Sequence, residues 1–136
     1  MSDEVESSPP KRTKVNHVGA PAVFELELAC QELNRAFRDG YGCYLVGSSL
    51  ERPDWRDVDV RMILPDEDFD KLFPGAESHW EFDPRWIIIT TSISQWLAKR
   101  TGLPVDFQFQ PQTHANSAHK GARHALGLRF AVRDNE

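Results

Sequence analysis

The chain has 136 residues and a net charge of −5, with 40% hydrophobic and 27% charged residues, a composition typical of a folded domain with one core. The acidic balance excludes a protein coated with basic side chains for nucleic-acid binding. No apolar run approaches the roughly 20 residues of a membrane span. The two cysteines, Cys30 and Cys43, lie outside any metal-ligand spacing, and the N-terminus has no hydrophobic signal region, so we expect free thiols and a cytoplasmic protein.

Residues 1–18 are predicted to form a disordered tail, because Ser and Pro dominate and few side chains can enter a core. Residues 19–136 are predicted to form a single domain, in which residues 111–136 make up a basic C-terminal segment.

The folded part begins with a predicted helix between Pro21 and Gly40. Its apolar residues are spaced three and four apart, which places on one helix face Val23, Leu26, Cys30, Leu33 and Phe37. Residues 41–46 then form a short apolar run, which predicts a buried strand that turns into a loop at Gly47-Ser48-Ser49.

Residues 57–64 alternate between charged and apolar side chains, which predicts a strand with one charged face. A short acidic helix over residues 66–73 follows. Asp83-Pro84 is a typical helix start, and we expect a helix from there to Arg100. The β-branched run at residues 87–91 would suit a strand, but the length and the capping signal favour the helix.

Residues 105–110 alternate again and predict a last strand, whereas residues 111–136 are left without an assignment. The order of helices and strands predicts a small α/β or α+β domain.

Charge is unevenly distributed along the chain. Residues 50–83 contain eleven acidic and four basic residues, whereas residues 107–133 contain no acidic residue. Such a chain can hold cations with one part and phosphates with the other, or simply present two differently solvated faces.

Asp57 and Asp59 are two residues apart on a predicted strand, so their carboxylates point the same way and can share a hard divalent cation. Because unpaired neighbouring carboxylates repel, the pair needs a cation, a proton or an arginine. Arg56 and Arg61 are near in sequence, so a salt-bridged surface strand is the alternative to a metal site.

Two further features suit phosphoryl transfer. Gly47-Ser48 follows a strand and allows phosphate oxygens to approach the backbone and a hydroxyl. Asp106 lies between Val105 and Phe107, and a carboxylate in so apolar a strand must complete a cation site, act as a base, or be satisfied otherwise.

These segments resemble the DNA polymerase beta-like nucleotidyltransferase superfamily, whose smallest members are minimal nucleotidyltransferases. The resemblance covers residues 23–110 and depends on Val46-Gly47-Ser48, an eight-residue gap, Asp57-Val58-Asp59-Val60, and later Val105-Asp106-Phe107. The stretch from Gly102 to Gln108, together with residues 115–116, His119 and residues 125–127, is similar to predicted nucleotidyltransferases of phage and bacterial genomes.

The resemblance implies a mixed β-sheet packed against helices and the transfer of NMP from a nucleoside triphosphate, such as ATP, to a hydroxyl, with release of pyrophosphate. Asp57 and Asp59 would ligate two Mg²⁺ (or Mn²⁺) ions, and Asp106 would ligate the catalytic ion and help deprotonate the acceptor. Gly47 and Ser48, with Ser49 beside them, would hold the β- and γ-phosphates. The family pattern usually has small or polar residues where this chain has Trp55-Arg56, and larger relatives carry an extra helical domain that is missing here.

Basic residues outside that pattern are candidates for contacts with phosphate. Lys120 and Arg123 are expected to reach the triphosphate or an acceptor phosphate, and Arg52 is a further triphosphate candidate. His119 is either a structural histidine or an acid–base group. The acceptor is a protein side chain, an RNA end or a small molecule.

Two alternatives stay open. A degenerate nucleotidyltransferase fold would bind a nucleotide or a protein without turnover, as a homodimer or with a partner protein. A metal-dependent nuclease would use similar carboxylates but needs a lysine near the acidic strand, where only Lys71 and Lys99 are available.

Overall fold

The computed structural model describes residues 16–128, which form a four-stranded mixed sheet packed with helices. The strands follow the spatial order β4-β3-β2-β5 and span Gly42–Val46 (β2), Val58–Leu64 (β3), Val105–Pro111 (β4) and His124–Leu126 (β5). β2 is antiparallel to both β3 and β5, whereas β3 is parallel to β4. The predicted α+β class and mixed sheet are thereby confirmed.

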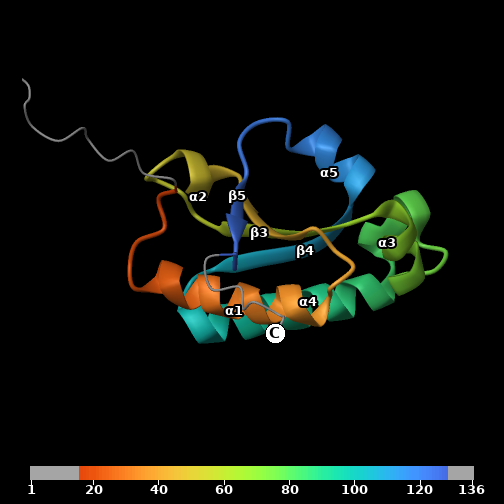
Figure 1. Cartoon of the computed structure of the whole chain (residues 1–136), viewed down its shortest axis with the longest axis horizontal. Coiled ribbons are helices and arrows are strands. Elements are labelled where there is room, and N and C mark those ends of the chain that lie inside the picture. Colours follow the sequence, from red (N-terminus) through yellow and green to blue (C-terminus); the bar gives the residue numbers. More distant parts are fainter. Residues whose placement is uncertain (1–15, 129–136) are drawn as a thin grey trace, which may run out of the picture.

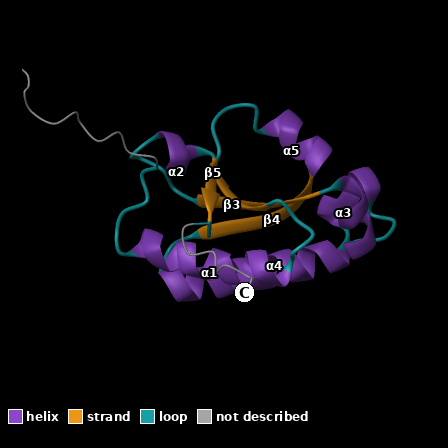
Figure 2. Cartoon of the chain, in the orientation of Figure 1, coloured by secondary structure: helices purple, strands orange, loops and turns teal. Residues whose placement is uncertain are grey.

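The two long helices, α1 (Ala22–Ala36) and α4 (Pro84–Thr101), lie together against one face of the sheet (Figure 1). The short helices α2 (Ser48–Glu51) and α5 (Gln112–Ala118) lie on the opposite side, as Figure 2 also shows. Two further short elements, α3 (Asp66–Leu72) and the 3-10 helix η1 (Glu77–Phe82), connect β3 to α4. The sheet therefore has one face covered by long helices and one face covered only in part.

The core lies between the sheet and the α1–α4 layer. Alternate residues of β3 and β4 point into it, and the fully buried members are Val58, Val60, Met62, Phe107 and Phe109. The helix face predicted from the spacing in α1 is confirmed, because Leu26, Cys30 and Leu33 are buried and the ends of the stripe are partly buried.

The start of α4 is held by the predicted cap. The Asp83 carboxylate accepts hydrogen bonds from the N–H groups of Arg85 and Trp86, and Pro84 occupies the first turn. Gly102 ends the helix in the left-handed region at φ +75°. The β-branched run at residues 87–91 is therefore helical, and the side chains of α4 reach the outer edge of β4, where the Trp86 Nε1–H donates to the Phe109 carbonyl at 3.0 Å.

Three short helices were not predicted. Residues 48–51 are helical where a loop was expected, and η1 and α5 lie in segments that had no clear periodicity. Each is four to seven residues long, so packing decides its conformation more than propensity does. The C-terminal segment adds β5, an edge strand that pairs with β2.

The predicted boundary between the N-terminal tail and the folded part, after residue 18, differs from the boundary in the structure. Val18 is buried in the core, and the His17 N–H donates to the Ser49 carbonyl at 2.8 Å, so these residues belong to the folded part. Residues 1–15 of the tail, and residues 129–136 of the basic segment, lie outside the described residues. Across residues 16–128, no helix has the length and apolar character needed to cross a membrane.

Candidate functional site

The three predicted carboxylates lie at one end of the β3–β4 pair. Asp59 on β3 is directly opposite Asp106 on β4 in the parallel register, so both side chains point to the sheet face away from α1 and α4. Asp57 comes just before β3, and it lines the same surface pocket as Asp106. The structure therefore brings together three carboxylates that come from two separate segments of the sequence.

Arg61 lies two residues after Asp59 on the same face and supplies a counter-charge. Its guanidinium is 3.8 Å from the Asp59 carboxylate and 3.5 Å from that of Asp106, and it donates at 2.7 Å to the Asp106 carbonyl. Only 8% of Arg61 is exposed, and its Nε atom has no hydrogen-bond partner within the described residues. The expected alternative was a salt bridge exposed to solvent. The structure instead shows a buried arginine that pairs with two acids.

The pKa of Asp59 is raised above its ordinary value. Burial is the main cause, and the negative charges of Asp106 and Asp57 add to it, while Arg61 opposes the shift. Burial and the neighbouring acids therefore disfavour the ionised form of Asp59 more than the Arg61 guanidinium favours it. Additional positive charge at this point is electrostatically favourable.

Gly47 packs directly against the Asp59 side chain. Its φ is +79° and ψ is −156°, a conformation that residues with a Cβ rarely adopt. A Cβ at this position would overlap the Asp59 carboxylate and lie 3.3 Å from its Cγ. The resulting bend continues into Ser48 and into Ser49, whose buried hydroxyl has no hydrogen-bond partner among the described residues. The sequence predicted this turn beside the Asp57 and Asp59 pair, and the structure places Gly47 against Asp59.

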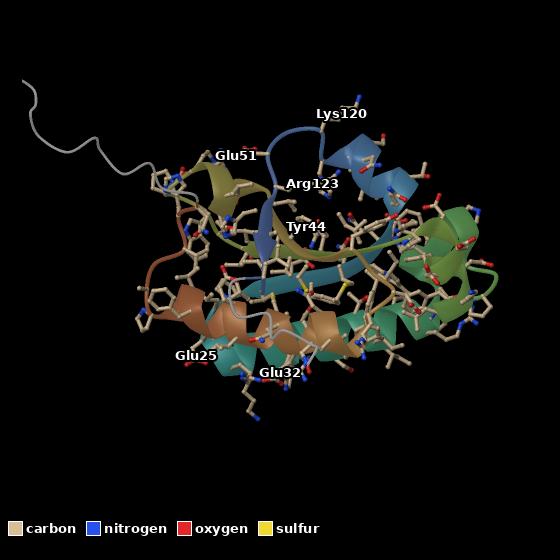
Figure 3. The ribbon with its side chains drawn as sticks, viewed as in Figure 1. Glu25, Glu32, Tyr44, Glu51, Lys120 and Arg123 are labelled. Carbon is tan, nitrogen blue, oxygen red and sulfur yellow. The ribbon has the colours of Figure 1, made fainter. Side chains whose placement is uncertain are left out.

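Among the described contacts, the predicted cationic residues Arg52, Lys120 and Arg123 form no ion pair with the three carboxylates. Arg52 is exposed and pairs with Asp54 at 3.5 Å. Lys120 is exposed and extends away from the sheet (Figure 3). Arg123 donates to the His119 and Ala115 carbonyls and to the Asn116 side chain, so its guanidinium holds the C-terminal end of α5.

His119 connects this cationic region to the sheet. Its Nε2 is 3.1 Å from the Gln110 side-chain oxygen on β4. Burial lowers the pKa of His119, and the nearby Arg61, Arg123 and His114 lower it further. The imidazole is thus favoured in its neutral form, mainly because it is partly buried and in addition because positive groups lie near it.

No group of three His, Cys, Asp or Glu side chains within residues 16–128 is arranged to hold a metal ion as the side chains stand. Arg61 occupies the space between Asp59 and Asp106, so a cation bridging them requires its guanidinium to move. The donor chemistry nevertheless fits Mg²⁺ or Mn²⁺, because carboxylate oxygens are the ligands that these hard cations prefer.

Comparison with known proteins gives no relative: no protein-family model, no curated protein and no solved structure matches this chain. The site must therefore be judged by its own geometry. Two of its features had no clear sequence signal. The first is the burial of Arg61, which its alternating strand pattern suggested only as a surface pair. The second is the pocket beside Asp57 and Asp106, whose wall comes from α4.

Proposed function

We propose that the chain is a metal-dependent nucleotidyltransferase, which transfers NMP from a nucleoside triphosphate to a hydroxyl and releases pyrophosphate. One observation carries the proposal: Asp59 and Asp106 face each other in register, with Gly47 pressed against Asp59 where no Cβ fits. A glycine bend beside paired carboxylates gives phosphate oxygens access to a site that has acid ligands for divalent cations. The resemblance of these segments to the polymerase beta-like superfamily supports the same reaction.

Each residue has a role that follows from its position. Asp57, Asp59 and Asp106 would hold Mg²⁺ or Mn²⁺, which when bound would neutralise triphosphate charge. Gly47 leaves room beside Asp59, and Ser48 follows it as the first residue of α2, so its hydroxyl would be a further phosphate contact. Arg61 pairs with Asp59 and Asp106 while no cation is bound, and its guanidinium would move toward the phosphates when a cation binds between these acids.

Asp106 is the favoured proton acceptor for the attacking hydroxyl. Its side chain is 46% exposed, compared with 24% for Asp59, so it is reached more easily by a second substrate. A carboxylate within hydrogen-bond reach of an attacking hydroxyl can accept its proton as the new bond forms. Lys120, Arg123 and Arg52 remain candidates for outer phosphate contacts.

The two cysteines, Cys30 and Cys43, are free thiols, which suits a reducing compartment such as the cytoplasm.

The experiment is a transfer assay with each α-labelled nucleoside triphosphate and Mg²⁺ or Mn²⁺. It follows label on the protein itself, on RNA and on small hydroxyl compounds. Asp57→Ala and Asp59→Ala are expected to abolish transfer, because each removes a carboxylate from the site. The Asp70→Ala substitution on the exposed side of α3 is the matched control and should leave transfer unchanged. Circular dichroism of all variants separates loss of chemistry from loss of fold, and transfer that survives both site substitutions contradicts the assignment.

A second candidate is supported by the position of Arg61. Because this arginine already pairs with Asp59 and Asp106, the site is partly neutralised without a metal ion. A nucleotide-binding module without turnover, acting through a partner chain, would have this property. Calorimetry with each triphosphate and Mg²⁺, followed by a pyrophosphate assay, distinguishes the two functions. Binding without pyrophosphate release over a broad acceptor panel favours the module.

A further inference from the structure

A pocket of about 320 Å³ opens at the outer edge of β4, beside the carboxylates. Its floor and walls come from Ser94, Gln95 and Ala98 of α4 and from Val105 of β4, and its rim includes the acids Asp57 and Asp106. This volume is at the lower end of the roughly 300–1,000 Å³ typical of small-molecule sites. Pockets of similar size elsewhere in the described residues lie away from the three carboxylates.

The pocket and the glycine bend are on opposite flanks of the carboxylate pair. Gly47 follows β2 and touches Asp59 on β3, whereas the pocket lies beyond Asp106 on β4. A group-transfer site must place its two substrates on two sides of the reacting phosphorus. With the triphosphate at the glycine bend, the pocket is the remaining place for the acceptor.

The charge of the pocket differs from that of the rest of the site. The residues that line it include two acids, Asp57 and Asp106, and no lysine or arginine. The Asp106 carboxylate is paired with Arg61 at 3.5 Å, so Asp57 is the acid of the lining whose negative charge is least compensated. The positive groups Arg61 and Arg123 instead lie near the neutral His119, on the sheet face beside α5. Phosphate groups are therefore repelled at the pocket, and uncharged or cationic compounds are accepted.

The wall of the pocket is fixed in place. The Ser94 hydroxyl donates to the Phe107 carbonyl at 3.2 Å and accepts from the Phe107 N–H at 2.9 Å, which attaches α4 to the edge of β4. The exposed Gln95 amide adds a donor and an acceptor at the mouth. A preformed wall with a few polar groups is the usual form of a site for a small ligand.

We propose that this pocket is the acceptor subsite, and that it selects a compact hydroxyl compound without phosphate over the end of an RNA chain. The inference rests on the proposed nucleotidyl transfer. In the step, the acceptor oxygen forms a bond to the α-phosphorus and the bond from that phosphorus to the bridging oxygen breaks. The acceptor proton passes to Asp106, and pyrophosphate leaves with the electron pair of the broken bond.

The test measures binding without nucleotide or metal, so that it does not depend on turnover. Amide chemical shifts of the full-length ¹⁵N-labelled chain are followed with matched pairs: a ribonucleoside and its 5′-monophosphate, and a hexose and its 6-phosphate. We expect the phosphate-free members to shift the amides of Gln95, Ala98 and Val105. The phosphorylated members should bind at least about tenfold more weakly, because they approach acidic lining residues and meet no lysine or arginine there.

Substitutions on one helix provide the controls. Ala98→Leu fills the pocket and should abolish the shifts, whereas Ser92→Leu, at an exposed position of α4 outside the pocket, should leave them unchanged. Gln95→Lys adds a positive charge at the mouth and should reduce the discrimination against phosphate to about threefold or less. Unfolding midpoints of the variants show that each is folded.

Several outcomes overturn the inference: no shifts at the pocket with any phosphate-free compound, equal or tighter binding of the phosphorylated members, or binding of an RNA 3′ end at these amides. Selective binding of phosphate-free compounds, combined with no transfer from any nucleoside triphosphate, leaves the pocket's selectivity intact and rejects the proposed function. The two claims therefore fail in distinguishable ways.

Discussion

Gly47→Ala tests the packing between the glycine bend and Asp59. Gly47 has a positive φ, and a backbone conformation reserved for glycine costs about 1–3 kcal/mol when another residue adopts it. The new methyl group would also overlap the Asp59 carboxylate. Turning that side chain off its rotamer adds about 0.5–1.5 kcal/mol. We expect a total loss of about 2–4 kcal/mol in the free energy of unfolding.

Gly75→Ala is a matched control, because Gly75 has the same φ of +79° but no heavy atom within 4 Å of the place that a methyl group would take. Its loss should be limited to the backbone strain, about 1–2 kcal/mol. Urea unfolding followed by circular dichroism measures both variants. The difference between them combines the contact with Asp59 and the additional backbone strain at the Gly47 ψ of −156°.

A double-mutant cycle identifies the partner of that contact. In an Asp59→Ala background the carboxylate is absent, so Gly47→Ala should be less destabilising than in the natural sequence by about 1 kcal/mol. Equal losses for Gly47→Ala and Gly75→Ala, together with no coupling to Asp59, would refute the reasoning. Phosphate would then have no specially shaped bend beside this acid.

Two further predictions concern the charges around the site. The pKa of Asp59 is raised on folding, so ionising it weakens the fold as pH rises from its ordinary value of 3.8 through the folded pKa. Asp59→Asn should therefore be more stable than the natural chain at pH 7, with the advantage disappearing below about pH 3.8; thermal unfolding across pH measures this, and a constant difference at all pH values contradicts it. Arg123→Ala removes three hydrogen bonds that hold the end of α5 and should lower the free energy of unfolding by about 1–2 kcal/mol. Lys120→Ala, at an exposed neighbouring position, should change it by less than about 0.5 kcal/mol in the same urea titration, and equal effects would show that Arg123 has no structural role.

Most regular elements follow from local patterns. The stripe of α1, the alternation of β3 and β4, and the Asp83-Pro84 start of α4 all predicted elements close to those in the structure. In each, side-chain periodicity and capping chemistry agree with the burial that the fold requires. The short elements α2, η1 and α5 lacked such a pattern, because a helix of one or two turns depends on the surfaces around it.

Some features of the candidate site could also be predicted from the sequence, and others could not. The order of Gly47-Ser48, Asp57, Asp59 and Asp106 along the chain indicated a common site, and the parallel register of β3 and β4 places Asp59 opposite Asp106. Sequence could not predict that Arg61 is buried between these acids. Its alternating position specifies only a sheet face, whereas its burial depends on what packs above that face.

Interactions between near neighbours in the chain specify the helices and strands that have strong periodicity, and their order specifies the α+β class. The amino-acid sequence was therefore sufficient to predict these elements, the class, and that the three aspartates belong to one region. Which groups are neighbours in space depends on how the elements pack. Packing placed Arg61 between two carboxylates, Gly47 against one of them, and a wall of α4 beside the third. Strand register and helix docking bring together residues that are far apart in the chain. The effect of one residue's charge or shape on another therefore follows only from the tertiary structure.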